Sequence, residues 1–252
     1  MSGETSYSNV LSEEESNKMI ERAKEFFRKE IASSHIRNTQ KLKKLKEFHL
    51  NPFLDKYKAR FLTGNDDPVS IAKALVYPRV LGTSINTTFG NKLQKFCSEV
   101  LGSFASTTAG IDIEFIDKVD GRRKYCQVKA GPNTINKDDV ETIKNHFASV
   151  KRLARTNNLH IGFADLVVGV LYGTPKQLSG HYQKINQEYP VIVGQEFWYR
   201  ITGIESFYQK LTDAIGEVAT EFDSSKLIEE IIEQLAKEIE KTMNVDKAKG
   251  NA

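Results

Sequence analysis

Asp112, Glu114, Gln127 and Lys129 bring two carboxylates, an amide and an ammonium together within one short segment. Carboxylate and amide oxygens are hard ligands that suit Mg²⁺, which keeps several of its waters and binds phosphate oxygens. A nearby ammonium can position an attacking water and offset the negative charge that builds on a phosphorus atom. These residue types therefore indicate metal-dependent hydrolysis of a phosphodiester.

A β-hairpin is the element that can position these side chains. Apolar and polar residues alternate over residues 111–116, as in a half-buried strand, and residues 124–130 form the expected return strand. Between them, Asp120-Gly121 is a strong signal for a two-residue hairpin turn. The sequence therefore predicts two adjacent antiparallel strands.

The turn length sets which residues face one another. With a two-residue turn, Asp112 faces Lys129 and Glu114 faces Gln127 across the hairpin. Residues two apart share a face, so these four side chains and Tyr125 point to one side. A turn of three or four residues would change the register and leave the strands adjacent. A cross-strand ion pair on a solvent-facing sheet, worth only ~0.2–1 kcal/mol, is the alternative interpretation.

The elements around the hairpin predict an α/β or α+β fold, with a small mixed sheet flanked by helices. The continuous apolar run over residues 164–172 is rich in β-branched residues and fits a buried central strand. We find no linker that divides the chain. The other expected elements are helices over residues 13–31, 70–76, 88–101 and 138–154, a strand over residues 190–194, and two C-terminal helices.

The composition is that of an ordinary globular protein. Of the 252 residues, 39% are hydrophobic and 27% are charged, which excludes a disordered chain, a collagen or a disulfide scaffold. No apolar run is long enough to cross a bilayer, so we expect no membrane partner, and the polar residues 1–9 are no signal peptide. Cys97 and Cys126 form no CxxC pair, which predicts reduced thiols in the cytoplasm. The histidines show no metal-binding spacing, and we expect His146 at the surface or boundary of its helix.

Charge is unevenly distributed along the chain. Residues 35–60 hold eight Lys or Arg against two Asp or Glu, and residues 122–155 hold nine against three, so each block has a net charge of +6. Residues 195–241 have a net charge of −6. A polyanion such as nucleic acid is the natural partner of the basic blocks. Solvated, Lys-rich helix faces are the alternative explanation.

Two short segments resemble the PD-(D/E)xK nuclease signature. They are Gly110-Ile111-Asp112 and Gln127-Val128-Lys129, with a spacing of 17 residues from Asp112 to Lys129. The segment over residues 129–136, which leads into a helix, is similar to the one that follows the catalytic lysine in type II restriction endonucleases. Over roughly Leu50 to Val218 the chain resembles the branch that cuts interrupted palindromes of the RGGNCCY type. Further similar segments lie at residues 50–54, 77–82, 168–173 and 194–198.

The resemblance implies a restriction-endonuclease-like core and a single nuclease domain over residues 1–252. Residues 1–60 are then a helical, basic N-terminal region, residues 61–200 the catalytic core, and residues 201–252 the C-terminal helices. Because a palindrome is read most simply by a two-fold dimer, we expect a homodimer on double-stranded DNA. The sequence has no GxxxxGK[ST] loop, which predicts that no nucleotide cofactor is used.

The resemblance also implies the roles of the site residues. Asp112 and Gln127 bind Mg²⁺ together with the backbone carbonyl of Val128. Lys129 positions the attacking water and stabilises the transition state, so that Asp112, Gln127 and Lys129 are the expected catalytic residues. The products carry a 5′-phosphate and a 3′-hydroxyl.

Two positions depart from the family pattern. Ile111 stands where the signature has a proline, and Gln127 stands where it has an acid. An amide oxygen can still bind Mg²⁺ but contributes no charge, so the metal affinity should be lower unless another ligand helps. Glu114, Gln94 and Glu99 are the candidates for that third ligand, although each is explained as simply by a position on a solvated surface.

Basic and polar residues near the signature and beyond it are the candidate DNA contacts. Contacts to phosphates position a protein on DNA, whereas contacts to base edges specify the sequence. Polar residues directly after the signature can instead simply shape the loop. The candidates are Asn133, Thr134, Asn136, Lys137, Arg79, Arg122, Arg123 and Lys144.

Two other functions fit the same residues. The missing acid at position 127 is consistent with a nuclease-fold protein that binds DNA and has lost catalysis. A nuclease that recognises DNA structure, such as a junction or repair nuclease, is the second alternative. Cleavage of plain linear DNA into discrete fragments would separate both from an enzyme of restriction-modification defence.

Overall fold

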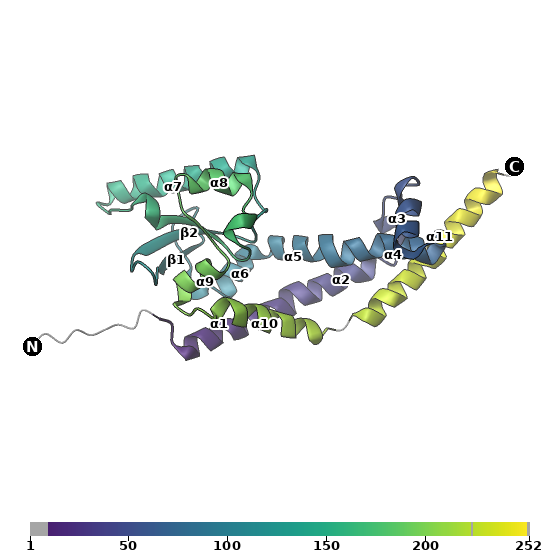
Figure 1. Cartoon of the computed structure of the whole chain (residues 1–252), viewed down its shortest axis with the longest axis horizontal. Helices are drawn as coiled ribbons and strands as arrows, with labels where there is room; N and C mark the ends of the chain where they lie inside the picture. Colours follow the sequence, from purple (N-terminus) through teal and green to yellow (C-terminus); the bar gives the residue numbers. More distant parts are fainter. Residues whose placement is uncertain (1–9, 223, 251–252) are drawn as a thin grey trace, which may run out of the picture. The chain divides into compact units, whose positions relative to one another are not determined.

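The computed structural model describes residues 10–222 and 224–250 (Figure 1). The chain divides into two compact units, the first made of the residues up to Phe26 and of residues 92–217, and the second of residues 27–91 and those from Val218 onward. The single domain expected from the sequence stays a prediction. The expectation of no signal peptide concerns residues 1–9, which lie outside the described part.

A four-stranded mixed sheet forms the centre of the first unit. β1 (Ile113–Ile116) pairs antiparallel with β2 (Arg123–Lys129), and β3 (Leu166–Val170) and β4 (Val191–Val193) continue the sheet in parallel, in the order β1-β2-β3-β4. Every residue of β3 is buried, as its run of apolar, β-branched residues requires. The predicted α+β fold, with a small mixed sheet flanked by helices, is confirmed.

Helix α7 (Lys137–Thr156) connects β2 to β3 and covers one face of the sheet (Figure 1). It begins at a capping box in which Asn136 and Asp139 each accept a hydrogen bond from the other's backbone N–H. Its buried stripe packs with alternate residues of β3 and with α8 (Gly180–Asn186) in one core. The stripe consists of Val140, Ile143, Phe147, Val150 and Ala154.

The opposite face of the sheet is covered by α9 (Gln195–Thr202). Phe197 and Trp198 of this helix are fully buried, as the sequence indicates for core residues. The Phe197 ring lies so close to Gly169 of β3 that a Cβ there would come within 2.2 Å of it. Trp198 in turn contacts the ring of Phe96 edge-on. A glycine in the central strand thus allows α9 to pack directly on the sheet.

The hairpin loop is longer than predicted. Ile113 pairs with Cys126 and Ile116 with Arg123, and the Asp117 N–H donates to the Arg122 carbonyl at 2.9 Å. The loop therefore has four residues, 118–121, and the two-residue turn at Asp120-Gly121 is wrong. Its closing bond, from the Gly121 N–H to the Asp117 carbonyl at 2.8 Å, belongs to this wider turn.

The second unit is helical. Asp67 caps its helix α4 by accepting a hydrogen bond from the Ser70 N–H at 2.7 Å, next to a proline at the first helical position. Apolar side chains of α4 and α11 make up most of its core. No helix in the described part of the chain is both long and apolar enough to cross a membrane. The helices are α2 (Ser33–Lys41), α3 (Leu54–Thr63), α4 (Pro68–Pro78), α5 (Ile85–Asn91) and α11 (Ser225–Gly250).

Most expected helices are found with changed limits. The helix expected over residues 13–31 is α1 (Glu13–Phe26), followed by a π-helical segment, Phe27–Ala32. The helix expected over residues 88–101 is wrong as one element, because it forms α5 and the separate α6 (Leu93–Glu99). The C-terminal helices are α10 (Phe207–Thr220) and α11. Sequence patterns did not predict α2, α3, α8 or α9 as separate helices.

Candidate active site

The four-residue loop shifts the pairing of the site residues by two positions. The register begins at Ile113, which pairs with Cys126, and the Asp112 N–H just before it also donates to the Cys126 carbonyl, at 3.0 Å. Glu114 pairs with Tyr125. The predicted pairs Asp112–Lys129 and Glu114–Gln127 are therefore wrong. Gln127 and Lys129 lie two residues apart in β2 and therefore share one face of the sheet, whereas the common face predicted for Asp112 stays a prediction.

Asp112 is held at the point where the first strand begins. Its Oδ2 accepts a hydrogen bond from the Val128 backbone N–H at 2.7 Å. The N–H and C=O of one residue leave a strand on the same side, so the Val128 carbonyl points to this same edge. The chain turns away from β2 at Gly110, whose φ is +79°. A carboxylate oxygen and a backbone carbonyl thus share an open edge of the sheet.

Gln127 is buried, and its amide is anchored on the nitrogen side. Nε2 donates to the Gly110 carbonyl and lies 2.6 Å from Nδ1 of His146. Since a carbonyl can only accept, the nitrogen must face Gly110, and Nδ1 of His146 is then the acceptor. Within the described residues nothing donates to Oε1 of Gln127. The amide oxygen is therefore oriented and available as a ligand.

His146 is the site residue that sequence reasoning missed. It is half-buried on α7, as expected for a boundary position, and it packs against Gly110. A Cβ on Gly110 would come within 2.6 Å of the imidazole Cγ, so only glycine leaves room for the ring. The available signal was spacing, because His146 lies three residues after the buried Ile143 and so faces the sheet.

Lys129 ends β2 with its side chain half-exposed. Its backbone carbonyl accepts a hydrogen bond from the Leu171 N–H at 3.0 Å, which fixes the strand end against β3. Within the described part of the chain, no carboxylate pairs with its ammonium. A lysine held by its backbone but without a counter-ion can interact with an incoming anion.

Glu114 is engaged elsewhere. Its Oε1 accepts hydrogen bonds from the hydroxyls of Ser106 at 2.6 Å and Thr108 at 3.2 Å. Its Oε2 lies 3.1 Å from Arg123. These bonds tie the segment before β1 to the hairpin, and they occupy both oxygens of the carboxylate.

Gln94 and Glu99 lie on α6, close to the site. Burial raises the pKa of the Cys97 thiol of this helix to about 12, and the charge of Asp112 adds to this rise. Gln94 lies three residues before Cys97 and therefore on the same side of the helix. Glu99 is exposed, and its carboxylate is 3.5 Å from Lys95. Gln94 is exposed as well, and the role of either residue as a third ligand stays a prediction.

The donors at the sheet edge are oxygen atoms, the ligand type that a hard cation prefers, but together they carry little negative charge. They are the Asp112 carboxylate, the Gln127 amide oxygen and the Val128 carbonyl, with one formal negative charge between them. Among the described residues, no three His, Cys, Asp or Glu side chains come together in a way that could hold a metal ion. An all-oxygen set of this type suits Mg²⁺, with waters and a substrate phosphate completing its coordination.

The candidate DNA contacts after the signature are partly used by the protein itself. Asn136 caps α7, and the Thr134 hydroxyl donates to the Gly131 carbonyl at 2.9 Å. Both side chains therefore shape the loop, as the simpler interpretation holds. Asn133 and Lys137 are exposed and make no bond to other described residues through their side chains.

Three basic candidates are paired with acids. Arg122 lies 2.5 Å from Asp165, and Lys144 lies 2.5 Å from Glu188. Arg123 is the partner of Glu114. Arg79 belongs to the second unit, where its guanidinium lies 5.8 Å from the centre of the Phe48 ring. Their role in DNA binding stays a prediction.

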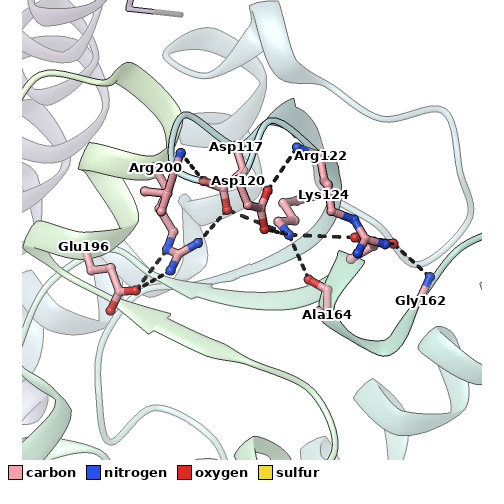
Figure 2. A network of polar contacts seen from close by, with 10 residues as sticks. Asp117, Asp120, Arg122, Lys124, Gly162, Ala164, Glu196 and Arg200 are labelled. Carbon is pink, nitrogen blue, oxygen red and sulfur yellow. Dashed lines mark hydrogen bonds and ion pairs between the residues drawn. The ribbon is translucent and has the colours of Figure 1, made fainter.

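A buried ion network holds the loop end of the hairpin (Figure 2). The Lys124 ammonium lies 2.5 Å from Asp120 and 3.7 Å from Asp165, which precedes β3. Arg200 of α9 donates to Asp117 at 2.7 Å. These contacts connect both strands of the hairpin to β3 and α9. They thereby hold the hairpin in place, and with it Asp112 and Gln127.

A mixed β-sheet with an acid, an amide and a lysine at one end of a hairpin defines a restriction-endonuclease-like α+β protein. The family model of the type II restriction endonuclease EcoO109I matches residues 15–223. The chain therefore belongs to this family of type II restriction endonucleases, which makes it a site-specific, DNA-binding nuclease and a hydrolase. No individual curated protein matches the chain.

Proposed function

We propose that this protein is an Mg²⁺-dependent type II restriction endonuclease that cuts double-stranded DNA at a short palindrome. The observation that supports this most is the bond from the Val128 N–H to Asp112, which holds the carboxylate beside the oriented Gln127 amide. We further propose that it acts in the cytoplasm, in restriction-modification defence, and without a nucleotide cofactor.

In this proposal each residue has one task. Asp112, Gln127 and the Val128 carbonyl hold Mg²⁺, which would withdraw charge from the scissile phosphate and acidify a bound water. The Lys129 ammonium positions the attacking water and stabilises the charge that develops on the phosphate oxygens. The attacking water would form the new P–O bond and lose one proton to solvent, and the leaving 3′-oxygen would take up one proton from solvent as the P–O3′ bond breaks, so that the products carry a 5′-phosphate and a 3′-hydroxyl. We propose an RGGNCCY-type interrupted palindrome as the site.

Digestion of a fully sequenced plasmid tests this function. With Mg²⁺ we expect discrete fragments whose ends map to one palindrome, and no fragments with a chelator. Sequencing the ends gives the cut position, and ligation without prior phosphorylation verifies the 5′-phosphates. A gel shift without cutting would support the inactive DNA-binding protein, and cutting of branched DNA alone would support the junction nuclease.

We also propose that the protein is a homodimer. Helix α3 of the second unit presents large apolar side chains on one side, with Phe53 87% and Phe61 82% exposed. Tyr57, between them, stacks on Phe61 with ring centres 6.1 Å apart. Together with Leu54 and Leu62 they offer roughly 600 Å² of apolar surface. A standard interface buries about 800 Å² per partner, so a second copy fits this face.

Sedimentation tests the dimer. We expect the wild-type protein to sediment as a dimer and the variant Phe53→Ser/Phe61→Ser as a monomer with an unchanged circular dichroism spectrum. An exposed control, Leu81→Ser, should keep the dimer because Leu81 lies outside α3. A dimer that survives the double substitution would exclude this face as the interface.

A further inference from the structure

The first unit contains a cavity of about 430 Å³ whose lining is strongly basic. Arg122, Lys151, Arg155 and His160 contribute to its wall, together with the backbone at Gly162. Neither the family match nor the candidate catalytic residues account for this cavity.

The cavity lies at the opposite edge of the sheet from the candidate active site. Arg122 precedes β2 and Gly162 precedes β3, and these two strands are parallel. Gln127 and Lys129 lie towards the far end of β2. At about 3.3 Å per residue, the cavity and the site are roughly 20 Å apart along the strand.

Among the described residues, two of the three cationic side chains that line the cavity, Lys151 and Arg155, have no counter-charge. Within the described residues, no carboxylate pairs with Lys151, Arg155 or His160. The Lys151 ammonium lies 3.0 Å from the centre of the Phe163 ring. Desolvation lowers the pKa of Lys151, and the charge of Arg155 lowers it further. Two cations are thus crowded together, and a bound anion would relieve their repulsion.

The third cation, Arg122, is held in place by a buried carboxylate (Figure 2). Oδ2 of Asp165, which is buried, accepts hydrogen bonds from Arg122 at 2.5 Å and from the Gly162 N–H at 2.8 Å. The Arg122 side chain nevertheless remains 54% exposed. An arginine that is oriented by a buried acid and still open to solvent is preorganised to bind a phosphate.

We propose that this cavity binds a backbone phosphate of the DNA duplex, outside the recognised bases. The proposal rests on the proposed function, because it takes DNA as the substrate. With one phosphate per 3.4 Å on each strand, a distance of roughly 20 Å corresponds to about six base pairs from the scissile bond. The contact is to phosphate, so it extends the footprint without reading sequence.

The test measures DNA affinity on duplexes of two lengths, both centred on the site mapped by plasmid digestion. Mg²⁺ is left out so that cutting does not interfere. For Lys151→Ala/Arg155→Ala, we expect the affinity for a 30-base-pair duplex to fall roughly tenfold or more. The slope of log K against log salt should decrease by about two, because a dimer loses one phosphate contact in each protomer. On a 10-base-pair duplex, which ends before the cavity, the variant and the wild type should bind equally.

Arg152→Ala is the matched control, because it removes one charge from the same helix. Its guanidinium donates to Ser149 at 2.7 Å and does not line the cavity. An equal loss for Arg152→Ala, or an equal loss on both duplexes, would overturn the proposal. Free phosphate would be the ligand instead if two results came together. Inorganic phosphate would shift the Gly162 amide resonance of the wild type, and Lys151→Ala/Arg155→Ala would bind DNA as tightly as the wild type. A wild-type protein that neither binds nor cuts DNA would instead overturn the proposed function itself.

Discussion

Replacing Gln127 with glutamate tests how the site is built. The amide of Gln127 donates to the Gly110 carbonyl and to Nδ1 of His146, and a carboxylate can donate to neither. In Gln127→Glu, two acceptors would face each other in a buried place, and the new charge would lie beside Asp112. The same substitution doubles the negative charge available to a metal ion.

The lost hydrogen bonds lower the stability of the folded protein and tighter metal binding raises it, and the two contributions are of comparable size. A buried carbonyl left without its donor costs about 1–3 kcal/mol. For a protein of this length, each kcal/mol lowers the melting temperature by about 2–4 °C. Without metal we therefore expect Gln127→Glu to melt roughly 5 °C below the wild type. A metal ion at one hundred times its dissociation constant returns about 2.7 kcal/mol, so Mg²⁺ should restore most of this loss.

Thermal unfolding with Mg²⁺ and with a chelator, both without DNA, measures these terms. We expect Mg²⁺ to raise the melting temperature of Gln127→Glu by several degrees more than that of the wild type. Gln195→Glu is the control, since the Gln195 amide also donates to a carbonyl, that of Glu205, and Gln195 is on α9, which carries no candidate metal ligand. Equal Mg²⁺ shifts in the wild type and Gln127→Glu would refute the assignment of position 127 as a metal ligand.

Three further substitutions test the contacts around the hairpin. In Lys129→Ala, cleavage of plasmid DNA should fall by several orders of magnitude while specific binding survives in a gel shift, because the lost ammonium acts on the transition state. Gly110→Ala should lower the free energy of unfolding, measured in urea, by about 1 kcal/mol or more beyond the effect of Gly121→Ala. Both positions have a positive φ, but a Cβ would clash with the imidazole at Gly110 and would meet open space at Gly121, whose φ is +70°. In Lys124→Met, loss of the buried ammonium should destabilise the fold by about 3–5 kcal/mol in the same assay. Desolvation raises the pKa of Asp120, but the hydrogen bond from Lys124 and that from the Arg122 N–H outweigh it, so this pKa is lowered. The wild-type protein should therefore keep the contribution of this pair above pH 4 and lose it as the pH falls through the lowered pKa, and Lys124→Met should show less of this acid dependence.

Each of these substitutions has an outcome that contradicts the expectation. Unchanged cutting by Lys129→Ala would remove that residue from the mechanism. Equal unfolding free energies for Gly110→Ala and Gly121→Ala would show that the imidazole does not pack on position 110. A Lys124→Met protein as stable as the wild type would mean that the acids around it relax into solvent without cost.

The sequence predicts the face of the site residues better than their pairing. Alternation with period two places Gln127 and Lys129 on one side of β2 whatever the loop length. Asp120-Gly121 resembles a two-residue turn, but the buried Asp117 bonds to Arg200 of α9 and leaves the strand early. That bond is a tertiary contact, which no local pattern contains.

The missed elements have similar causes. Asn51-Pro52 indicates the end of a helix, yet the Asn51 side chain accepts from the Leu54 N–H at 3.2 Å and starts α3. Residues 190–194 are predicted as a strand, and the chain enters α9 directly after Gly194, whose positive φ of +57° makes the sharp turn. Local patterns mark the boundary in both cases but do not identify the helix that begins beyond it.

The contacts of Gln127 give a physical reason for an amide at this position. An acid there would add charge for the metal ion, but it would have no proton to donate to the Gly110 carbonyl. In this chain Gly110 turns sharply to admit the His146 ring, and its carbonyl is thereby directed at the side chain of residue 127. The amide satisfies that carbonyl with its nitrogen and presents its oxygen to the edge where Asp112 lies. The glutamine, the glycine and the histidine therefore depend on one another. Restoring full metal affinity should require changing Gly110 and His146 together with Gln127, and not Gln127 alone.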